Sequence, residues 1–538
     1  MQTSTKRKTF DEHQQSLNDI SLLDDNAESH LMTGDHQSSG YLASEDASNH
    51  INVQSQACQM QFCTLESSIP TGNYTVQNSS SSIRLSFTSG SPISQPDWHS
   101  DRVHGSPVSA SCVTEDPNDL KSKLRDIEHK MLGAEYDTIE RLKNTYSAHQ
   151  PPGLEKWRQV MGIPRGDLKQ HLIACARAIA ENDLLAVKWL IPELKHMVSV
   201  SGEPVQRLGA YLLEGLIAKL SASGSSIYKA LECKQPASPD LLSYMHILYE
   251  VCPYFKFGYL SANGAISEAI KDENMVHIID FQIAQGSQWV TLIQALAERP
   301  GGPPHLRITG IDDPYNAHAR GGGLHIVGRR LSRLAHSCNV PFEFHAVPIS
   351  GCDVEIEHLD IRPGEQLAVN FAMELHHIPD ESVSTRNHRD RILRMAKSLS
   401  PKVVTLVEQE ANTNTAPFFA RFLEILEYYA AVFESIDVTL PRENKERINV
   451  EQHCLARDIV NVIACEGAER VERYELFGKW KSRLTMAGFR PCPLSPLVNA
   501  TIKTLLHSYS QCYQLEERAG VLYLGWMNKP LVVSSAWR

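Results

Sequence analysis

The residues with the clearest chemical potential lie between Val276 and Trp289, where the chain reads VHIIDFQIAQGSQW. The apolar run at 276–279 is typical of a fully buried parallel strand, and Asp280 follows at its carboxyl end. Apolar residues recur at helical spacing from Trp289 onward. The pattern predicts a strand, a turn and a helix, with polar side chains in reach of one another. The candidates for a partner site or a degenerate ligand pocket are Asp280, Gln282, Gly286, Gln288, Trp289, Asp312 and Asp313.

Acids at the ends of the first two predicted strands allow two interpretations. In a methyltransferase-like fold, Asp312 would hold the ribose of S-adenosylmethionine, which predicts a methyltransferase or a ligand sensor. Such a site needs a glycine-rich first turn, and this turn has only Gly286, with Phe281 and Ile283 in the way. The sequence favours the other interpretation, a turn without a cofactor. There Asp280 would accept hydrogen bonds from the amides of the turn and of the helix start.

Other residues that could do chemistry have weaker support. His376 and His377 could transfer a proton, but the sequence places no nucleophile, acid or metal ligand beside them, so a structural role is favoured. The twelve cysteines contain no Cys-x-x-Cys. We therefore predict no zinc site, no disulfide framework and no cofactor.

Binding to nucleic acid would require a local basic patch, because the net charge is −11 and provides no general basic field. Two helical regions concentrate arginines. The candidate DNA contacts are Arg329, Arg330, Arg333, Arg389 and Arg391. Most such clusters are solvated helix faces, so direct DNA contact is the less favoured interpretation. Three tryptophans, Trp480, Trp526 and Trp537, are predicted to be structural and buried.

The elements that must position these residues follow from the apolar periodicity. Residues 165–272 predict a helical cap, and residues 273–538 predict an α/β core. Parallel strands are expected at 275–281, 306–311, 342–347, 366–371 and 403–407, and antiparallel strands at 512–515, 521–526 and 531–537. The predicted fold class is α/β: a Rossmann-like, methyltransferase-like doubly wound sheet with an N-terminal helical cap and antiparallel C-terminal strands.

The N-terminal part of the chain differs in composition. Residues 1–115 are rich in Ser, Gln and Asn, with sparse and aperiodic apolar residues, so they predict a disordered tail. Residues 116–164 predict a short helix and a linker. We find neither a signal peptide nor an apolar run long enough for a membrane span, so we expect an intracellular protein without membrane contact.

The motif set resembles that of the GRAS family of plant transcriptional regulators. The resemblance rests on the 276–289 motif, on leucine-rich blocks at 168–272 and 324–340, on Arg447–Val450 and on Ser535–Trp537. It covers about 165–538. The polar tail and the sequence EHKMLG resemble the scarecrow-like branch linked to phytochrome A signalling and to chitin-inducible, gibberellin-responsive members. The Asp-Glu-Leu-Leu-Ala motif of the gibberellin repressors is absent, so binding to the gibberellin receptor is not implied.

The resemblance implies a nuclear transcriptional co-regulator without enzymatic activity, which acts in light, hormone or elicitor responses. The implied partners are other GRAS proteins and zinc-finger DNA-binding transcription factors, with a homodimer and direct DNA contact as further expectations. The implied location is the nucleus, with the cytoplasm as a second site. A purely cytoplasmic signalling scaffold remains an alternative.

Overall fold

The computed structural model describes residues 162, 166–221, 238–313 and 323–538. The predicted tail at 1–115 lies outside the described residues. The predicted helix and linker at 116–164 lie outside them too, except for position 162.

Nine strands of the described chain form one sheet, in the order β3-β2-β1-β4-β5-β9-β8-β7, with β6 paired to β9. The first five strands run parallel to one another, and the others pair antiparallel. The strands are β1 (Met275–Asp280), β2 (His305–Ile311), β3 (Phe342–Val347), β4 (Gln366–Ala372), β5 (Val403–Gln409), β6 (Pro491–Cys492), β7 (Tyr513–Arg518), β8 (Val521–Trp526) and β9 (Lys529–Trp537). This is the predicted Rossmann-like, methyltransferase-like sheet.

β1 occupies the centre of the parallel half, which explains its apolar sequence. It pairs with β2 on one side and with β4 on the other, and residues 276–280 are all buried. A strand covered on both faces must be apolar along its length. The strand order reverses between β1 and β4, and the crevice at the carboxyl ends of such strands is where α/β proteins bind ligands. We call this edge the switch point.

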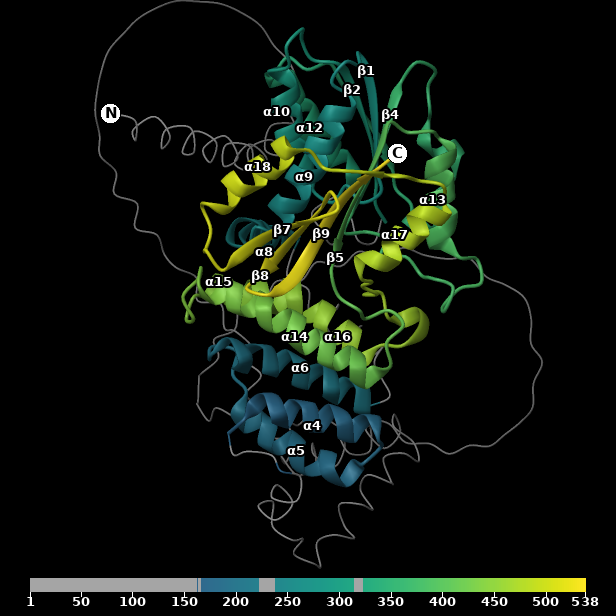
Figure 1. The fold of residues 1–538 in the computed structure, drawn as a ribbon. Coiled ribbons are helices and arrows are strands. Elements are labelled where there is room, and N and C mark those ends of the chain that lie inside the picture. The colour runs from purple at the N-terminus through teal and green to yellow at the C-terminus, as the bar shows by residue number, and fades with distance from the viewer. Residues whose placement is uncertain (1–161, 163–165, 222–237, 314–322) are drawn as a thin grey trace, which may run out of the picture. The chain divides into compact units, whose positions relative to one another are not determined.

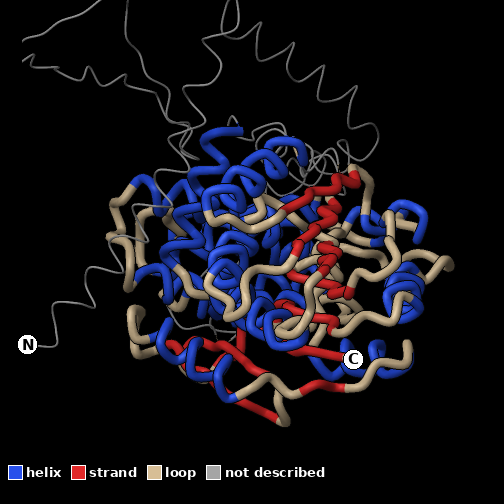
Figure 2. The backbone as a smooth tube through the Cα atoms, turned by 90° about the horizontal axis from the view of Figure 1, so that it is seen from above, coloured by secondary structure: helices blue, strands red, loops and turns tan. Residues whose placement is uncertain are grey.

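Helices cover both faces of the sheet (Figures 1 and 2). Among the described residues after β1, the α-helices are α10 (Ser287–Ala297), α12 (Leu324–Ser337), α13 (His388–Ser398), α14 (Phe418–Asp437), α15 (Lys445–Val450), α16 (Ala456–Ala464), α17 (Phe477–Met486) and α18 (Pro496–Leu506). Helices α10, α12 and α18 lie toward one face together with α9 (Tyr254–Ala269), and α13 and α17 lie toward the other (Figure 1).

The described helices before β1 lie in more than one layer, although the sequence predicted one cap at 165–272. They are α4 (Leu168–Ala180), α5 (Leu184–Met197), α6 (Pro204–Leu220), α8 (Ser238–Val251) and α9 (Tyr254–Ala269). Helices α4 to α6 stack on α14 and α16, whereas α9 packs directly on β5 and β9 (Figure 1). Gly258 allows this close approach, because a Cβ there would lie 2.6 Å from Val407 Cγ1.

Caps fix where the first helices begin. The Asp167 side chain accepts a hydrogen bond from the Gln170 backbone N–H at 3.0 Å, and Asp183 does the same for Ala186 at 3.0 Å. Each cap satisfies an N–H that has no partner inside its helix. None of the helices in the described ranges has the length and apolarity that crossing a membrane would need.

Candidate functional site

One buried carboxylate holds the end of β1 and the turn after it. Asp280 is the last residue of β1 and is 1% exposed. Its Oδ2 accepts a hydrogen bond from Trp289 Nε1 at 2.8 Å, and its Oδ1 accepts one from Asn370 Nδ2 at 3.0 Å. The backbone N–H of Gln282 donates to Oδ1 at 3.3 Å. Asp280 therefore joins β1, its turn, α10 and β4.

The sequence predicted main-chain amides as the donors to Asp280, and the structure corrects this in part. Only the Gln282 amide comes from the turn, and the two shorter hydrogen bonds come from side chains. The physical reason is the position of Trp289 in the first turn of α10. Helical side chains tilt toward the N-terminus of their helix, so the indole points back to the strand end.

A layer of amides surrounds the carboxylate. Gln288 Nε2 donates to Asn370 Oδ1 and to Asn263 Oδ1, each at 3.2 Å, and Gln288 Oε1 accepts from Asn370 Nδ2 at 3.1 Å. Asn263 belongs to α9 and also donates to the Gln288 carbonyl at 2.8 Å. Thr405 of β5 donates to Asn370 Oδ1 at 2.8 Å. The network thus ties α9 to three parallel strands through buried polar groups.

Sequence reasoning selected Asp280, Gln288 and Trp289 but missed Asn263 and Asn370. A signal for Asn370 existed, because it is a polar residue inside the apolar run of β4. Nothing comparable marked Asn263 in its helix.

Burial raises the pKa of Asp280 to about 6. The hydrogen bonds from Asn370, Trp289 and Gln282 oppose this shift, and the negative charge of Asp312 adds to it. Asp312 itself follows β2 and is buried. Asp313 is half-buried at the edge of the described residues. The structure therefore brings Asp312 into the electrostatic range of Asp280, as a fold of this type requires.

The turn after β1 has a demanding backbone. Gly286 has a φ of +70°, and a Cβ there would lie 2.9 Å from Val327 Cγ1 on α12. Ala284 also adopts a positive φ, +46°. Met373, directly after β4, has a φ of +58°. Such conformations in residues other than glycine store strain and concentrate at functional sites.

Bulky apolar side chains belong to the turn after β1. Phe281 and Ile283 are both buried. The Phe281 ring packs on Phe371 with 4.6 Å between centroids, and Ile283 Cγ1 would lie 3.0 Å from a Cβ at Gly310. The turn after β1 therefore has bulky apolar residues where a methyl-donor turn has glycines that let the backbone approach the ligand.

A second polar cluster follows β4 at the same edge. His376 Nδ1 lies 2.6 Å from Glu408 Oε2, and His376 Nε2 lies 3.4 Å from Glu472 Oε2. His377 Nε2 lies 3.3 Å from Glu472 Oε1, and its Nδ1 lies 3.6 Å from Glu374 Oε2. Two imidazoles thus stand among three carboxylates. Sequence reasoning did not place Glu472 beside the histidines, because it lies in a distant segment of the chain.

Burial alone would lower the pKa of both imidazoles, but the carboxylates outweigh it. The pKa of His376 is raised, chiefly by Glu408, and the pKa of His377 is raised well above its ordinary value by Glu472 and Glu374. For Glu472, burial opposes ionisation, but the two imidazoles hold its pKa well below the usual range. The carboxylates of the cluster therefore favour positive charge on the two imidazoles.

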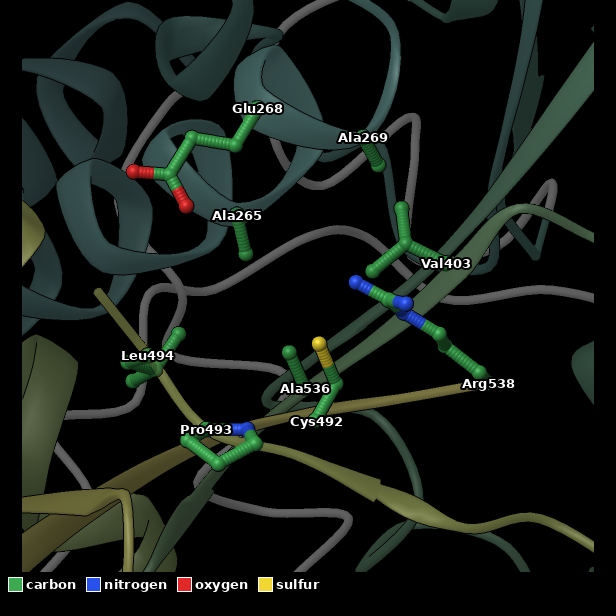
Figure 3. Close-up of a pocket in the computed structure, with 9 residues that line it drawn as sticks. All are labelled: Ala265, Glu268, Ala269, Val403, Cys492, Pro493, Leu494, Ala536 and Arg538. Atoms are coloured by element: carbon green, nitrogen blue, oxygen red, sulfur yellow. The ribbon is translucent and has the colours of Figure 1, made fainter.

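The two polar clusters meet at the switch point. Gln282 Nε2, from the turn after β1, lies 3.4 Å from His377 Nδ1, from the loop after β4. The pocket shown in Figure 3 is elsewhere, at the beginning of β5. It is lined by Ala265, Glu268, Ala269, Val403, Cys492, Pro493, Leu494, Ala536 and Arg538.

The structure removes Arg389 from the candidate DNA contacts. Its guanidinium is fully buried over the Trp480 ring at 4.9 Å, and it donates to the carbonyls of Ile378, His376 and Arg473. Arg389 lies on the buried face of α13, so its side chain points into the core. Arg391 is partly exposed but donates to the carbonyls of Val354 and Cys352.

The arginines of α12 have a different setting. Arg329 and Arg333 are exposed, and Arg330 is half-buried. These three lie together on one helix, on the sheet face opposite to α13 (Figure 1).

All three predicted structural tryptophans are buried. Trp526 Nε1 donates to Glu434 at 3.2 Å, and Trp537 Nε1 donates to Ser535 Oγ at 3.0 Å. Trp480 packs in the core between α13 and α17.

The fold and the motif at its switch point define a class of protein. The family model of the GRAS domain family matches residues 168–538, and the chain belongs to this family. It is 66% identical over 484 residues to chitin-inducible gibberellin-responsive protein 2 of Oryza sativa subsp. japonica. The aligned residues cover 90% of this chain and 89% of that protein. It is 66% identical to the scarecrow-like transcription factor PAT1 of Arabidopsis thaliana, over 80% of this chain and 88% of PAT1.

A solved structure agrees with the fold. The crystal structure of SCL7 of Oryza sativa is similar with a TM-score of 0.62 and 35% identity, over 69% of this chain and 99% of that chain.

Proposed function

We propose that this protein is a plant transcriptional co-regulator that acts in the nucleus by binding other proteins. The observation that carries the proposal is family membership over 168–538, together with similarity to a scarecrow-like transcription factor along most of both chains. The name of the rice relative supports a place in gibberellin or elicitor responses, and the name of PAT1 supports action as a transcription factor.

The switch point supports a binding role rather than methyl transfer. Asp280 accepts hydrogen bonds from Trp289, Asn370 and Gln282 within the protein, and Phe281 next to it is buried. On this view the role of Asp280 is structural. Its hydrogen-bond network holds α10 and α9 in fixed positions on the sheet, and these positions determine the surface that a partner would contact.

The proposed partners are other GRAS proteins and zinc-finger DNA-binding transcription factors, and a second copy of the chain is a further candidate. The test is capture from plant nuclear extract with the tagged full chain, followed by mass spectrometry. Imaging of the same tagged chain gives its location. We expect nuclear signal and enrichment of transcription factors over an unrelated tagged protein. Exclusion from the nucleus would favour the cytoplasmic scaffold instead.

Direct DNA contact is a second proposal, and the exposed arginines of α12 are its best remaining candidates. The variant with Arg329→Gln and Arg333→Gln removes two charges there. The matched control, with Arg362→Gln and Arg518→Gln, removes two exposed charges elsewhere. If α12 binds phosphates, the salt dependence of DNA affinity should lose about one unit of slope per contact in the first variant only. Equal behaviour of both variants would rule out this surface.

The alternative function, a methyltransferase or ligand sensor, has a direct test. Calorimetry with S-adenosylmethionine and the full chain should show no binding at micromolar concentrations. A heat signal that saturates at one equivalent would overturn the assignment of a structural role to Asp280.

A further inference from the structure

The cluster behind the switch point has the donor set of a metal site. His376, His377 and Glu472 each offer one ligand atom, and these atoms lie within 4.8 Å of one another. The two histidines follow β4, whereas Glu472 lies in the segment between α16 and α17. Imidazole nitrogen and carboxylate oxygen together suit divalent transition metals such as Zn²⁺.

The distances fit a tetrahedral ion. Metal–ligand bonds of about 2.0–2.1 Å place the donors of a tetrahedral zinc site about 3.3 Å apart. Both Nε2 atoms face the Glu472 carboxylate, at 3.4 Å for His376 and 3.3 Å for His377. Each Nε2 thus lies at about this spacing from one oxygen of Glu472, Oε2 for His376 and Oε1 for His377, and one donor atom from each of the three residues lies within 4.8 Å of the others.

The outer atoms of the imidazoles supply a second, independent observation. His376 Nδ1 lies 2.6 Å from Glu408 and His377 Nδ1 lies 3.6 Å from Glu374. Metal-ligating histidines almost always donate their other N–H to a carboxylate or carbonyl, which orients the ring and fixes the tautomer. Here both rings have an acid on the Nδ1 side, at hydrogen-bond distance for His376 and farther away for His377, and both direct Nε2 at Glu472.

Charge and access agree with this arrangement. Three carboxylates face two imidazoles, so with neutral imidazoles the cluster lacks positive charge, which a divalent ion supplies. The His377 side chain is 35% exposed, whereas that of His376 is 3% exposed. An ion therefore has a route from solvent on the His377 side.

We propose that His376 Nε2, His377 Nε2 and the Glu472 carboxylate bind one divalent transition-metal ion, with Zn²⁺ as the first candidate. The ion would link the loop after β4 to the segment before α17, because it would take ligands from both. It would also steady the contact between His377 and Gln282, and with it the switch point. This inference does not depend on the proposed regulatory function.

The competing occupant of the cluster is the proton, because protonated imidazoles would also hold the carboxylates together. A titration of the chelator-treated full chain with Zn²⁺ separates the two. Calorimetry gives the stoichiometry, and the visible absorption of bound Co²⁺ reports the geometry. We compare the wild type with Glu472→Gln and His377→Gln, and use His507→Gln, at an exposed helix end, as the matched control for general binding to histidines.

The expected result is one equivalent of Zn²⁺ in the wild type and in His507→Gln, with that equivalent lost in Glu472→Gln and His377→Gln. His377 is partly exposed, and Gln keeps a polar side chain there, so thermal unfolding without metal serves as the check that this variant folds. Glu408→Gln, which changes only an outer carboxylate, should weaken binding by about 10–100-fold. Binding that is equal in the wild type and the two ligand variants, or absent from the wild type, would overturn the proposal.

Discussion

Trp537 lies one residue from the end of the chain and yet is buried in the core. It is 1% exposed, and it pairs with Val404 of β5 on one side and with Pro491 of β6 on the other. Its ring packs near Phe477 with 6.4 Å between centroids. Chain ends usually fray, but here a large side chain near the end is buried. This burial predicts a large loss of folding free energy in Trp537→Ala.

The size of the penalty follows from the buried area. A tryptophan buries about 150–250 Å², which corresponds to about 4–6 kcal/mol of transfer free energy, an upper bound because the unfolded chain also buries some surface. Large-to-small substitutions of buried aromatic residues cost about 3–5 kcal/mol. For a folded region of about 370 residues, an unfolding entropy of about 0.8 kcal/mol/K translates this into a fall in Tm of about 4–6 °C.

The assay is thermal unfolding of the full chain, followed by circular dichroism. Trp537→Phe is the matched control, because it keeps a ring beside Phe477 and loses mainly the hydrogen bond to Ser535. We expect the Phe variant to lose less than half as much Tm as the Ala variant. Removal of residues 535–538 should give insoluble or unstable protein, since it deletes the end of β9 that pairs with β5 and β6. An Ala variant that melts within a degree of the wild type would refute the reasoning.

Four further predictions concern other parts of the chain. Deleting residues 1–115 should change Tm by at most about 2 °C, because this composition offers little surface for burial, and a larger drop would mean that the tail packs on the domain. In Asp280→Ala, the N–H groups of Trp289 and Asn370 that donate to this carboxylate lose their acceptor. The free energy of unfolding should therefore fall by about 2–4 kcal/mol, and the capture of partners should fall with it. Normal capture would contradict a structural role of Asp280 in partner binding. Gly258→Ala should lower stability by about 1–3 kcal/mol through overpacking. The control Gly478→Ala adds a Cβ with nothing within 4 Å, so it should be neutral or stabilising by up to about 1 kcal/mol. Equal Tm values for the two variants would refute the close approach of α9 to β5. Burial, with help from a neighbouring guanidinium, lowers the pKa of His277 to about 4, so the unfolded chain binds the extra proton first. Stability should therefore fall as pH drops from about 6.5 to 4, and His277→Gln should flatten that part of the profile measured by urea unfolding.

The strands and their direction could be predicted from the sequence, because burial on both faces leaves a continuous apolar run and one-sided exposure leaves alternation. The strands predicted at 275–281, 306–311 and 366–371 agree with β1, β2 and β4 to within one residue at each end. The limits of β7 were less accurate, since exposed glutamates extend this edge strand to Arg518. The division of the first helices among layers was not predictable, because it depends on a close contact between Gly258 and Val407.

By itself, the sequence determined the family and the fold class, and it made Asp280 a candidate site residue, since periodicity and motif spacing are local properties of the chain. Only the tertiary structure decided what the polar residues do. Asp280 takes its donors from α10 and β4, Arg389 turns inward beneath Trp480, and Glu472 reaches His376 and His377 from a segment far along the chain. The physical reason is that the state of a carboxylate, an imidazole or a guanidinium depends on burial and on the charges facing it, and both are set by residues that only folding brings together.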